Sequence, residues 1–368
     1  MAGIYFHVPF CRKKCTYCDF HFSTTFSGYR TPLLELMSRE FNQRLNELND
    51  PVETIYFGGG SPGLLTPTEL DLLLKEPIRI AGNQLKELTL EANPEDVTKA
   101  NLSAWKSLGI NRISLGIQSL NTSILSWMNR NHTVAQSLNA LDQLAAYDFS
   151  LSIDLIYGIP NQEINDLLGV IELLDLYHIE HFSAYALTKE PNTALARWIK
   201  QGKNAEIDDD QQITHYYTVQ KELKQRGFLQ YEVSNYSKNK QQAKHNANYW
   251  AGKPYLGIGP GAHSFDGVNT RRWNVPNNQR YLKQEDWFDV ELLSADNLWN
   301  ECWLTGLRTI HGVSLNKLQS LGGLTLNEKT ILNKLISDRL LRLDKQHYIL
   351  TNDGFLAADR LASMLFRI

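Results

Sequence analysis

The sequence predicts an α/β protein whose main unit is a partial barrel of six strand–helix repeats, followed by a small C-terminal domain. Short β-branched or aromatic runs alternate with amphipathic stretches of helical length through the first two thirds of the chain. Such alternation is typical of a parallel sheet with right-handed crossovers. Six units fit in roughly 190 residues, whereas a closed eight-stranded barrel needs about 250, so we expect an open TIM-like (β/α)6 barrel.

The predicted strands share a high content of β-branched and aromatic residues. They are expected at residues 4–8, 54–57, 88–91, 112–117, 151–156 and 182–187, with helices at 32–48 and 134–147. One helix start is well marked, because Thr66 can cap the helix, Pro67 suits its first position and Glu69 stands three residues after the cap. Gly109 and Gly227 are expected to end helices.

The character of the chain changes after Asp208. A polar helix is expected over residues 208–226. The Gly-, Asn- and Tyr-rich segment 230–278 is too long for a simple connection, so we expect it to be functional or packed across the barrel mouth.

The last part of the chain is again helical in pattern and has the order of a winged-helix-like module. A helix is expected over 326–337, two short strands over 340–343 and 348–351, and a closing helix over 352–366. We therefore divide the chain into a barrel core at 1–235, a bridging segment at 236–289 and a C-terminal domain at 290–368.

Composition narrows the class of protein. The 368 residues are 42% hydrophobic and carry 37 Lys+Arg against 40 Asp+Glu, which is typical of a globular protein and argues against a nucleic-acid partner. Arg342 and Lys345, in the C-terminal module, form no dense basic stripe. The sequence has no run of about 18 apolar residues and no secretory pattern at its N-terminus, so we expect a cytoplasmic protein.

The cysteines are the most informative residues. Cys11, Cys15 and Cys18 fall within eight residues, and the fourth cysteine is distant, so a disulfide scaffold is excluded. Three thiolates on one loop can hold three irons of a [4Fe–4S] cluster and leave the fourth iron open for another ligand. The alternative is a zinc site closed by His7 or His21, but no fourth cysteine or histidine stands at the usual zinc spacing.

The distant cysteine, Cys302, lies in an apolar helical pattern with Trp299 and Trp303. We expect it to be a buried free thiol.

Polar residues stand at or near the ends of the predicted strands. The second strand runs into the glycines 58–60, which let a backbone approach a ligand closely. Glu91, Gln118 and Asp154 follow on the third, fourth and fifth strands. Each can be a satisfied structural residue, since an unpaired buried polar group is costly. Together, beside a cysteine loop at the same edge of a sheet, they favour a ligand site.

The C-x3-C-x2-C spacing directly after the first strand resembles that of the radical S-adenosylmethionine (SAM) superfamily. The resemblance implies that SAM binds the open iron through its amino and carboxylate groups. It also implies that the reduced cluster cleaves SAM to methionine and a 5′-deoxyadenosyl radical. The SAM contacts that the resemblance implies by position are Tyr5, Gly59, Gly60, Ser61, Glu91, Gln118, Arg130, Asp154 and Ala184, with His263 or its neighbour Ala262 as a tenth.

Further motifs resemble one branch of this superfamily, which contains oxygen-independent coproporphyrinogen III dehydrogenase and the HemW-type haem chaperones. Three features favour the chaperones. Phe20 stands where the dehydrogenase has another cysteine, the first strand begins almost at Met1, and residues 245–250 match the H-N-x-x-Y-W signature of the HemW-like group. The dehydrogenase, which oxidatively decarboxylates a porphyrinogen, and a radical SAM enzyme with another substrate stay open as alternatives.

The resemblance to the chaperones also implies partners. These are haem, acceptor haemoproteins that include membrane-bound respiratory enzymes, and a homodimer, with transient contact at the membrane. His245 is a candidate haem ligand because imidazole binds haem iron, and Tyr249 and Trp250 offer flat faces for a porphyrin. The charges of residues 12–14 suit an acidic, flavodoxin-type reductant as well as a simple solvated loop.

Overall fold

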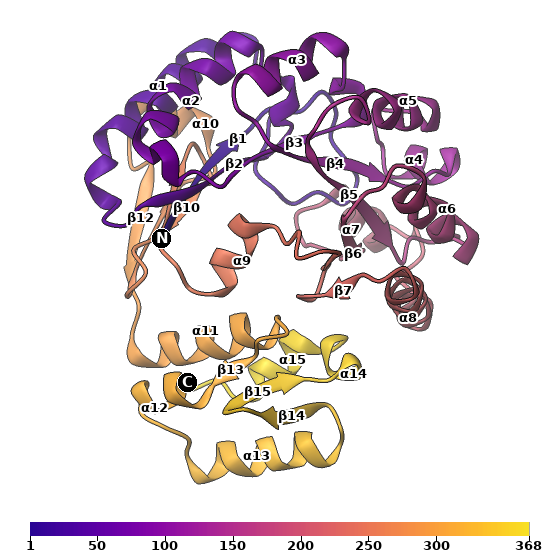
Figure 1. Ribbon diagram of the computed structural model, residues 1–368, viewed down its shortest axis with the longest axis vertical. Helices are drawn as coiled ribbons and strands as arrows, with labels where there is room; N and C mark the ends of the chain where they lie inside the picture. The colour runs from indigo at the N-terminus through magenta and orange to yellow at the C-terminus, as the bar shows by residue number, and fades with distance from the viewer. Residues whose placement is uncertain (368) are drawn as a thin grey trace.

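Six parallel strands in sequence order form the centre of the fold in the computed structural model, which describes residues 1–367 (Figure 1). They are β1 (Ala2–Val8), β2 (Val52–Gly59), β3 (Glu87–Ala92), β4 (Arg112–Gln118), β5 (Ser150–Tyr157) and β6 (His181–Ala186). Each pairs in parallel with the next. The six-stranded prediction is confirmed, and the sheet formed by the described residues curves without closing into a barrel.

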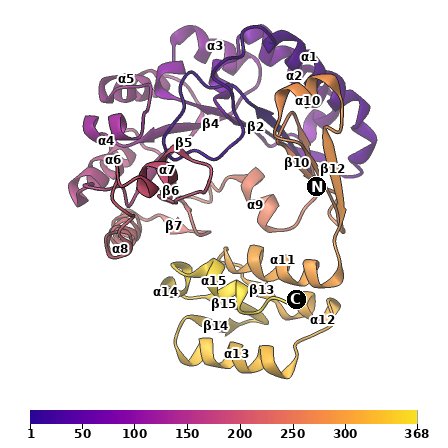
Figure 2. The same ribbon diagram turned by 180° about the vertical axis from the view of Figure 1, so that it is seen from behind.

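Helices cover the outer face of these strands (Figures 1 and 2). They are α1 (Arg30–Gln43), α2 (Pro67–Ala81), α3 (Lys99–Ser107), α4 (Thr122–Trp127), α5 (Val134–Leu144), α6 (Ile164–Leu176), α7 (Ala194–Lys200) and α8 (Asp209–Gln225). Thr66 and Glu69 form the expected capping box. The first helix ends earlier than expected, and residues Leu45–Glu47 form a separate 3-10 turn. No helix within residues 1–367 is long and apolar enough to cross a membrane.

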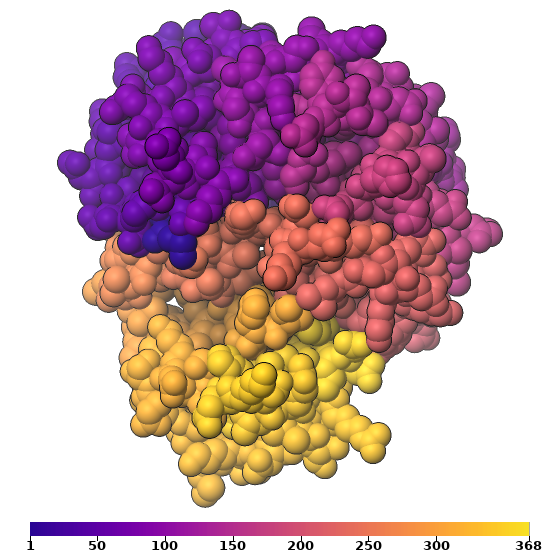
Figure 3. All heavy atoms as spheres, viewed as in Figure 1, coloured from indigo at the N-terminus to yellow at the C-terminus, as the bar shows by residue number. Residues whose placement is uncertain are grey.

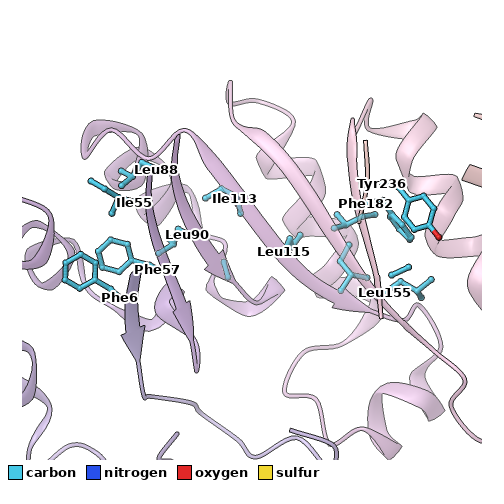
Figure 4. Close-up of a cluster of buried hydrophobic side chains, with 14 of the residues drawn as sticks. Phe6, Ile55, Phe57, Leu88, Leu90, Ile113, Leu115, Leu155, Phe182 and Tyr236 are labelled. Carbon is cyan, nitrogen blue, oxygen red and sulfur yellow. The ribbon is translucent and has the colours of Figure 1, made fainter. Parts of the chain in front are cut away.

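The two faces of the sheet differ in polarity because side chains alternate along a strand. The outward side chains are apolar and buried, and Phe6 stacks on Phe57 with 4.7 Å between ring centroids. Figure 4 shows this cluster, which includes Phe6, Ile55, Phe57, Leu88, Leu90, Ile113, Leu115, Leu155 and Phe182. The inward positions carry Tyr5, Tyr56, Glu91 and Asp154 instead. The lumen of the barrel is therefore polar.

The segment after α8 extends the sheet at both edges. Its elements are β7 (Leu229–Gln230), β8 (Asn235–Ser237), α9 (Lys244–Trp250), β9 (Tyr255–Ile258), β10 (His263–Phe265), β11 (Thr270–Asn274), α10 (Asn278–Lys283) and β12 (Phe288–Leu292). The strand order is β12-β11-β10-β9-β1-β2-β3-β4-β5-β6-β8-β7.

Instead of packing as a whole across the barrel mouth, most of this segment joins the sheet, and α9 crosses the gap between its two edges (Figures 1 and 2). This helix lies beside the amino-terminal ends of the strands, since it contacts Thr54 of β2 and Glu87, the first residue of β3. The division of the chain at 1–235, 236–289 and 290–368 stays a prediction.

The C-terminal domain packs beneath the barrel, as the space-filling view shows (Figure 3). Its order is α11 (Ala295–Leu307), β13 (Val313–Ser314), α12 (Leu315–Ser320), α13 (Leu326–Ser337), β14 (Leu341–Asp344), β15 (His347–Leu350), α14 (Asn352–Phe355) and α15 (Ala358–Ser363). The three strands form an antiparallel sheet in the order β13-β15-β14, which agrees with the expected winged-helix-like order. The expected closing helix is divided into α14 and α15. Cys302 is half-buried, and burial raises the pKa of its thiol to about 11.

A buried charge network fastens α1 to the strands of the β9 edge. The Glu40 carboxylate, which is 1% exposed, accepts hydrogen bonds from Arg44 Nη1 at 2.7 Å and Tyr281 Oη at 2.6 Å. It also accepts from Asn274 Nδ2 at 2.8 Å and from the backbone N–H of Gly259 at 3.0 Å. These four hydrogen bonds offset the free-energy cost of burying the Glu40 charge. The network holds β9 and α10 against the helix that covers β1.

Removal of this carboxylate is expected to destabilise the fold strongly. Glu40→Ala leaves Arg44 with Glu47 as its remaining carboxylate partner and deprives the buried Tyr281 hydroxyl and Gly259 N–H of their acceptor, which together costs about 3 kcal/mol in the free energy of unfolding. Urea unfolding followed by circular dichroism measures the loss. Glu76→Ala is the matched control, because Glu76 pairs with the exposed Arg79 on a helix surface, and such an exposed ion pair contributes little to the free energy of unfolding. Equal stability of the two variants would contradict the role assigned to Glu40.

Candidate functional site

The loop after β1 carries the three clustered cysteines and lies at the carboxyl end of the sheet, close to α7 (Figure 2). Backbone hydrogen bonds close its base, from Cys11 N to Ser23 O at 3.0 Å and from Ser23 N to Pro9 O at 2.9 Å. Its middle is held by Thr16, whose N–H donates to Met128 O at 3.1 Å and whose carbonyl accepts from Leu195 N at 2.8 Å. The loop is thus anchored to both α4 and α7 before any group binds.

The cysteine thiols suit a cluster better than a single ion. Burial raises the pKa of Cys11 to about 11 and that of Cys18 to about 12, so the free thiols hold their protons at neutral pH. Within residues 1–367, no three His, Cys, Asp or Glu side chains surround one metal-ion position. A closed zinc site needs its ligands on one ion, whereas each thiolate of an iron–sulfur cube binds its own iron.

His7 is not free to close a zinc site. Its Nε2 donates to the backbone oxygen of His21 at 2.8 Å, and its Nδ1 accepts from the Tyr5 hydroxyl at 3.2 Å. Burial lowers the pKa of His7 to about 4, so the ring is neutral. Both ring nitrogens are therefore used to join β1 to the cysteine loop, and the donor set fits a three-cysteine [4Fe–4S] cluster.

The glycine turn after β2 packs directly on the start of the cysteine loop. Gly60 N donates to Val8 O at 2.9 Å, and Ser61 N donates to Phe10 O at 2.7 Å. A Cβ atom on Gly60 would lie 2.6 Å from Phe10 O. Gly59 has φ +102°, and a Cβ there would meet the His7 ring at 2.7 Å. The two glycines are thus required for loop packing, while their contact with SAM stays a prediction.

Two carboxylates project into the polar lumen. Tyr56 Oη donates to Glu91 Oε1 at 2.7 Å, and Ser114 Oγ donates to Asp154 Oδ1 at 3.3 Å. Burial raises the pKa of Glu91 to about 7, with a further contribution from the charge of Asp154. Burial also raises the pKa of Asp154 to about 6. Tyr5 stacks on Tyr56 at 6.1 Å between ring centroids. This part of the lumen offers both acceptors and aromatic surface.

Polar atoms of Gln118, at the carboxyl end of β4, and of Arg130, in the loop after α4, are left without partners among the described residues. Gln118 ends β4 with φ +66°, a strained value for a residue other than glycine, and its Oε1 is unpaired. Arg130 donates to Gly116 O at 3.0 Å, to Asn93 Oδ1 and to Cys15 Sγ, yet its Nε is unpaired. Buried unpaired atoms of this kind are typical of a site that holds a ligand or water. They fit a polar ligand such as SAM.

The structure places several of the predicted SAM contacts, among them Gly60, Ser61 and Arg130, against the cysteine loop. Ser61 Oγ lies 3.7 Å from Cys11 Sγ and accepts from Asn93 Nδ2 at 2.9 Å. Ala184 is buried on β6, beside β5. His263 is exposed on β10, where it stacks on Trp273 with 6.2 Å between ring centroids.

The H-N-x-x-Y-W residues lie elsewhere, on α9 beside the amino ends of the strands. His245 is buried, its Nδ1 is hydrogen-bonded to Thr54 Oγ1 at 2.8 Å, and its Nε2 to Tyr249 Oη at 2.6 Å. Burial lowers its pKa to about 3. The Glu87 carboxylate accepts from the backbone N–H groups of Lys244 and His245 at 2.8 and 3.0 Å, and so caps α9 from the sheet.

Several site residues have roles that the sequence did not indicate. His7, considered only as a zinc ligand, and Tyr56 lie on the polar face of β1 and β2, and the two-residue period that starts from Tyr5 would have indicated this place for His7. Asn93 links Ser61 to Arg130, a role that no sequence pattern indicates. Arg12, expected as a free charge near the cluster, is instead paired with the buried carboxylate of Asp96.

Comparisons with known proteins agree with this geometry. Residues 5–174 match the family described as the Radical SAM superfamily. The chain is 35% identical to "Heme chaperone HemW" of Mycobacterium tuberculosis, over 99% of this chain and 94% of that protein. It is 28% identical to the Bacillus subtilis protein of the same name, over 98% of both chains.

Two further relatives extend the comparison. The chain is 33% identical to "Radical S-adenosyl methionine domain-containing protein 1, mitochondrial" of Danio rerio, over 89% of this chain and 73% of that one. Among solved structures, coproporphyrinogen III oxidase (HemN) from Escherichia coli matches 99% of this chain and 90% of its own with a TM-score of 0.84. The identity is 20%, so this likeness concerns the fold.

The fold and the three-cysteine loop are those of a radical SAM protein, a class whose members hold a [4Fe–4S] cluster and SAM. Within that superfamily, the chain belongs to the HemW family.

Loss of one clustered cysteine is expected to prevent cluster assembly. Cys11→Ala removes one of three thiolates, and two cannot hold the cube. After anaerobic reconstitution, iron and sulfide content and visible absorption should fall to background. Cys302→Ala is the control and should keep the wild-type iron content, since Cys302 lies in the C-terminal domain. A fully loaded Cys11→Ala protein would contradict the assignment.

Glu91 is expected to make the stability of the cluster-free protein depend on pH. Its pKa of about 7 in the folded protein exceeds the ordinary 4.5, so the folded state binds the proton more tightly than the unfolded chain. The contribution of Glu91 to the free energy of unfolding is complete below about pH 4.5. It decreases by up to about 3 kcal/mol as the pH rises through about 7.

Glu91→Gln should remove this contribution. Between about pH 5 and pH 8, the free energy of unfolding should fall less in the variant than in the wild type, as measured by urea titration. The other buried carboxylates are present in both proteins, so the difference between the two profiles reports the ionisation of Glu91 together with its effect on the neighbouring Asp154. Parallel profiles would show that Glu91 titrates normally.

Proposed function

We propose that this protein is a haem chaperone, which binds haem and delivers it to acceptor haemoproteins. The observation that carries the proposal is the match to proteins named "Heme chaperone HemW", at 35% identity over 99% of this chain and 94% of the relative. The match to the superfamily alone ends at residue 174. The longer match also covers α9 and the C-terminal domain, so it supports the specific family rather than the shared core.

In this proposal, the [4Fe–4S] cluster and SAM bind at the carboxyl end of the barrel. Cys11, Cys15 and Cys18 would hold the [4Fe–4S] cluster, which when bound supplies an electron to SAM. The SAM contacts are proposed as Tyr5, Gly59, Gly60, Ser61, Glu91, Gln118, Arg130, Asp154, Ala184 and His263. The carboxylates of Glu91 and Asp154 are suited to accept hydrogen bonds from the amino group and the ribose hydroxyls of SAM.

Haem binding at α9 would require a local opening of the structure. His245, Tyr249 and Trp250 are the proposed contacts, and the neutral imidazole of His245 is the form that binds iron. However, both of its nitrogens are already hydrogen-bonded, and the Tyr249 hydroxyl would have to leave Nε2. Trp250 is half-buried, with the Arg308 guanidinium 5.0 Å from its ring centroid. We propose that haem reaches these residues after α9 moves away from β1–β3.

The proposed partners follow from the same assignment. Acceptors would include membrane-bound respiratory enzymes, reached by a cytoplasmic protein that acts as a homodimer. A flavodoxin-type reductant would meet the cysteine loop at Lys13 and Lys14, which are exposed, whereas Arg12 is neutralised by Asp96.

The second candidate is radical oxidation of a porphyrinogen, the reaction of the dehydrogenase in the same branch, and HemN shares this fold. Because the identity is only 20%, this match shows a shared fold and does not indicate a shared activity. The fourth cysteine expected of the dehydrogenase is replaced by Phe20, which favours the chaperone.

Haem titration is expected to distinguish the two functions. Cluster-loaded protein should bind haem with a saturable Soret band and pass it to an apo-haemoprotein, which then acquires its own spectrum. An anaerobic assay of the same preparation with SAM, reductant and coproporphyrinogen should yield no decarboxylated product. Absence of haem binding would overturn the proposal, and formation of protoporphyrinogen would establish the enzyme instead.

A further inference from the structure

Two of the three clustered cysteines carry a side-chain hydrogen-bond donor on their sulfur atom. Ser61 Oγ donates to Cys11 Sγ at 3.7 Å, and Arg130 Nη1 donates to Cys15 Sγ at 3.5 Å. Hydrogen bonds to the ligand sulfurs are one of the features that set the reduction potential of an iron–sulfur cluster. A residue that directs these two donors therefore influences how readily the cluster gains an electron.

Asn93, which directly follows β3, contacts both donors through the two ends of one amide. Its Nδ2 donates to Ser61 Oγ at 2.9 Å, and its Oδ1 accepts from Arg130 Nη2. The chemistry of the partners fixes the orientation of this amide. Because a guanidinium carries donors only, the amide oxygen must face Arg130, and the NH2 group must then face Ser61.

The orientation of the amide determines where the proton of the Ser61 hydroxyl points. Ser61 Oγ accepts a hydrogen bond from Asn93, so its own proton cannot lie along that contact. The proton is therefore available to Cys11 Sγ, which is the acceptor on the other contact of the hydroxyl.

The same amide directs the Arg130 guanidinium. Arg130 Nη2 donates to Asn93 Oδ1 and, at 3.0 Å, to Gly116 O. With Nη2 held in this way, Nη1 is turned to Cys15 Sγ. A charged donor makes a stronger hydrogen bond to a thiolate than a neutral donor does, so this contact has the larger electrostatic effect on its sulfur.

The backbone of Asn93 is tied to the cysteine loop by a buried carboxylate. Asn93 N donates to Asp96 Oδ2 at 3.1 Å, and Asp96 Oδ1 accepts from Nη1 of Arg12, in the cysteine loop, at 2.5 Å. The Asp96 side chain is fully buried. The loop that carries the sulfurs and the residue that directs their donors are thus held in one register.

We propose that Asn93 is a positioning residue, which raises the reduction potential of the [4Fe–4S] cluster by directing Ser61 and Arg130 onto two of its ligand sulfurs. When the cluster gains one electron from a reductant, negative charge on the thiolates increases. Hydrogen bonds donated to these sulfurs stabilise that charge, so they favour the reduced cluster. The inference rests on the three-cysteine cluster and goes beyond the chaperone function, so the haem titration neither supports nor contradicts it.

The test is an anaerobic potentiometric titration of cluster-loaded protein with dithionite. SAM is left out, because Ser61 and Arg130 are also proposed SAM contacts. Asn93→Asp keeps the size of the side chain and an acceptor for Arg130. However, a carboxylate accepts from the Ser61 hydroxyl instead of donating to it, so the hydroxyl turns away from Cys11. At a fixed potential, the ratio of reduced to oxidised cluster should fall about tenfold, which corresponds to about 59 mV for one electron.

A double-mutant cycle separates redirection of the hydroxyl from the added negative charge. In a Ser61→Ala background no hydroxyl remains to be redirected, so Asn93→Asp should shift the potential by less than it does in the wild type. Asn129→Asp is the matched control, since Asn129 donates to Lys14 O in the cysteine loop at 2.6 Å rather than to a sulfur. It should shift the potential less than Asn93→Asp does.

Iron and sulfide content and resonance Raman spectra are measured for every variant. The iron–thiolate stretching modes should move to higher frequency in Asn93→Asp, because loss of a hydrogen bond to sulfur strengthens the iron–sulfur bond. A wild-type potential in Asn93→Asp, or an equal shift with and without the Ser61 hydroxyl, would overturn the proposal. Failure of Asn93→Asp to hold iron would also overturn it, since a residue that only directs donors is not needed for assembly. Failure of the wild type to hold iron would instead refute the three-cysteine cluster, and the proposal with it.

Discussion

The rest of the structure depends on one constraint, which is that the inner face of a six-stranded parallel sheet is polar and nevertheless buried. In most barrels of this type the interior is filled by branched apolar side chains. Here Glu91, Asp154 and Arg112 occupy it, and each carries a cost of desolvation that only close partners or a bound ligand can offset. The raised pKa values of the two carboxylates are direct consequences of this burial.

The two ends of the lumen are closed by different means. At the carboxyl end, the glycine turn after β2 packs against the cysteine loop so closely that a Cβ on Gly60 would overlap its backbone. At the amino end, α9 is tied to the sheet by Glu87, Thr54 and the aromatic stack of His245 on Tyr56, whose ring centroids are 5.0 Å apart. The cysteine loop and α9 thus lie at opposite ends of the polar lumen. A chaperone can use such an arrangement to separate its resident groups from its cargo.

The buried network around Glu40 explains how the segment after α8 supports this arrangement. It joins α1 to β9 and α10, and so places Asn278 next to the cysteine loop. Asn278 in turn is hydrogen-bonded to His21 at 2.7 Å. A structural ion network at the outer edge of the sheet therefore positions, through α10, a residue that contacts the cysteine loop.

The sequence by itself determined the six strands, the capping box at Thr66 and the three-cysteine loop, because each depends on residues near one another in the chain. It also indicated Glu91, Gln118 and Asp154, since the carboxyl ends of parallel strands meet at one edge. The tertiary structure decided that β9 pairs with β1, that His245 is buried against Thr54 at a separation of 191 residues, and that His21 meets Asn278 at a separation of 257. These contacts depend on how distant segments pack and on hydrogen bonds between single side chains, which leave no periodic pattern in the sequence.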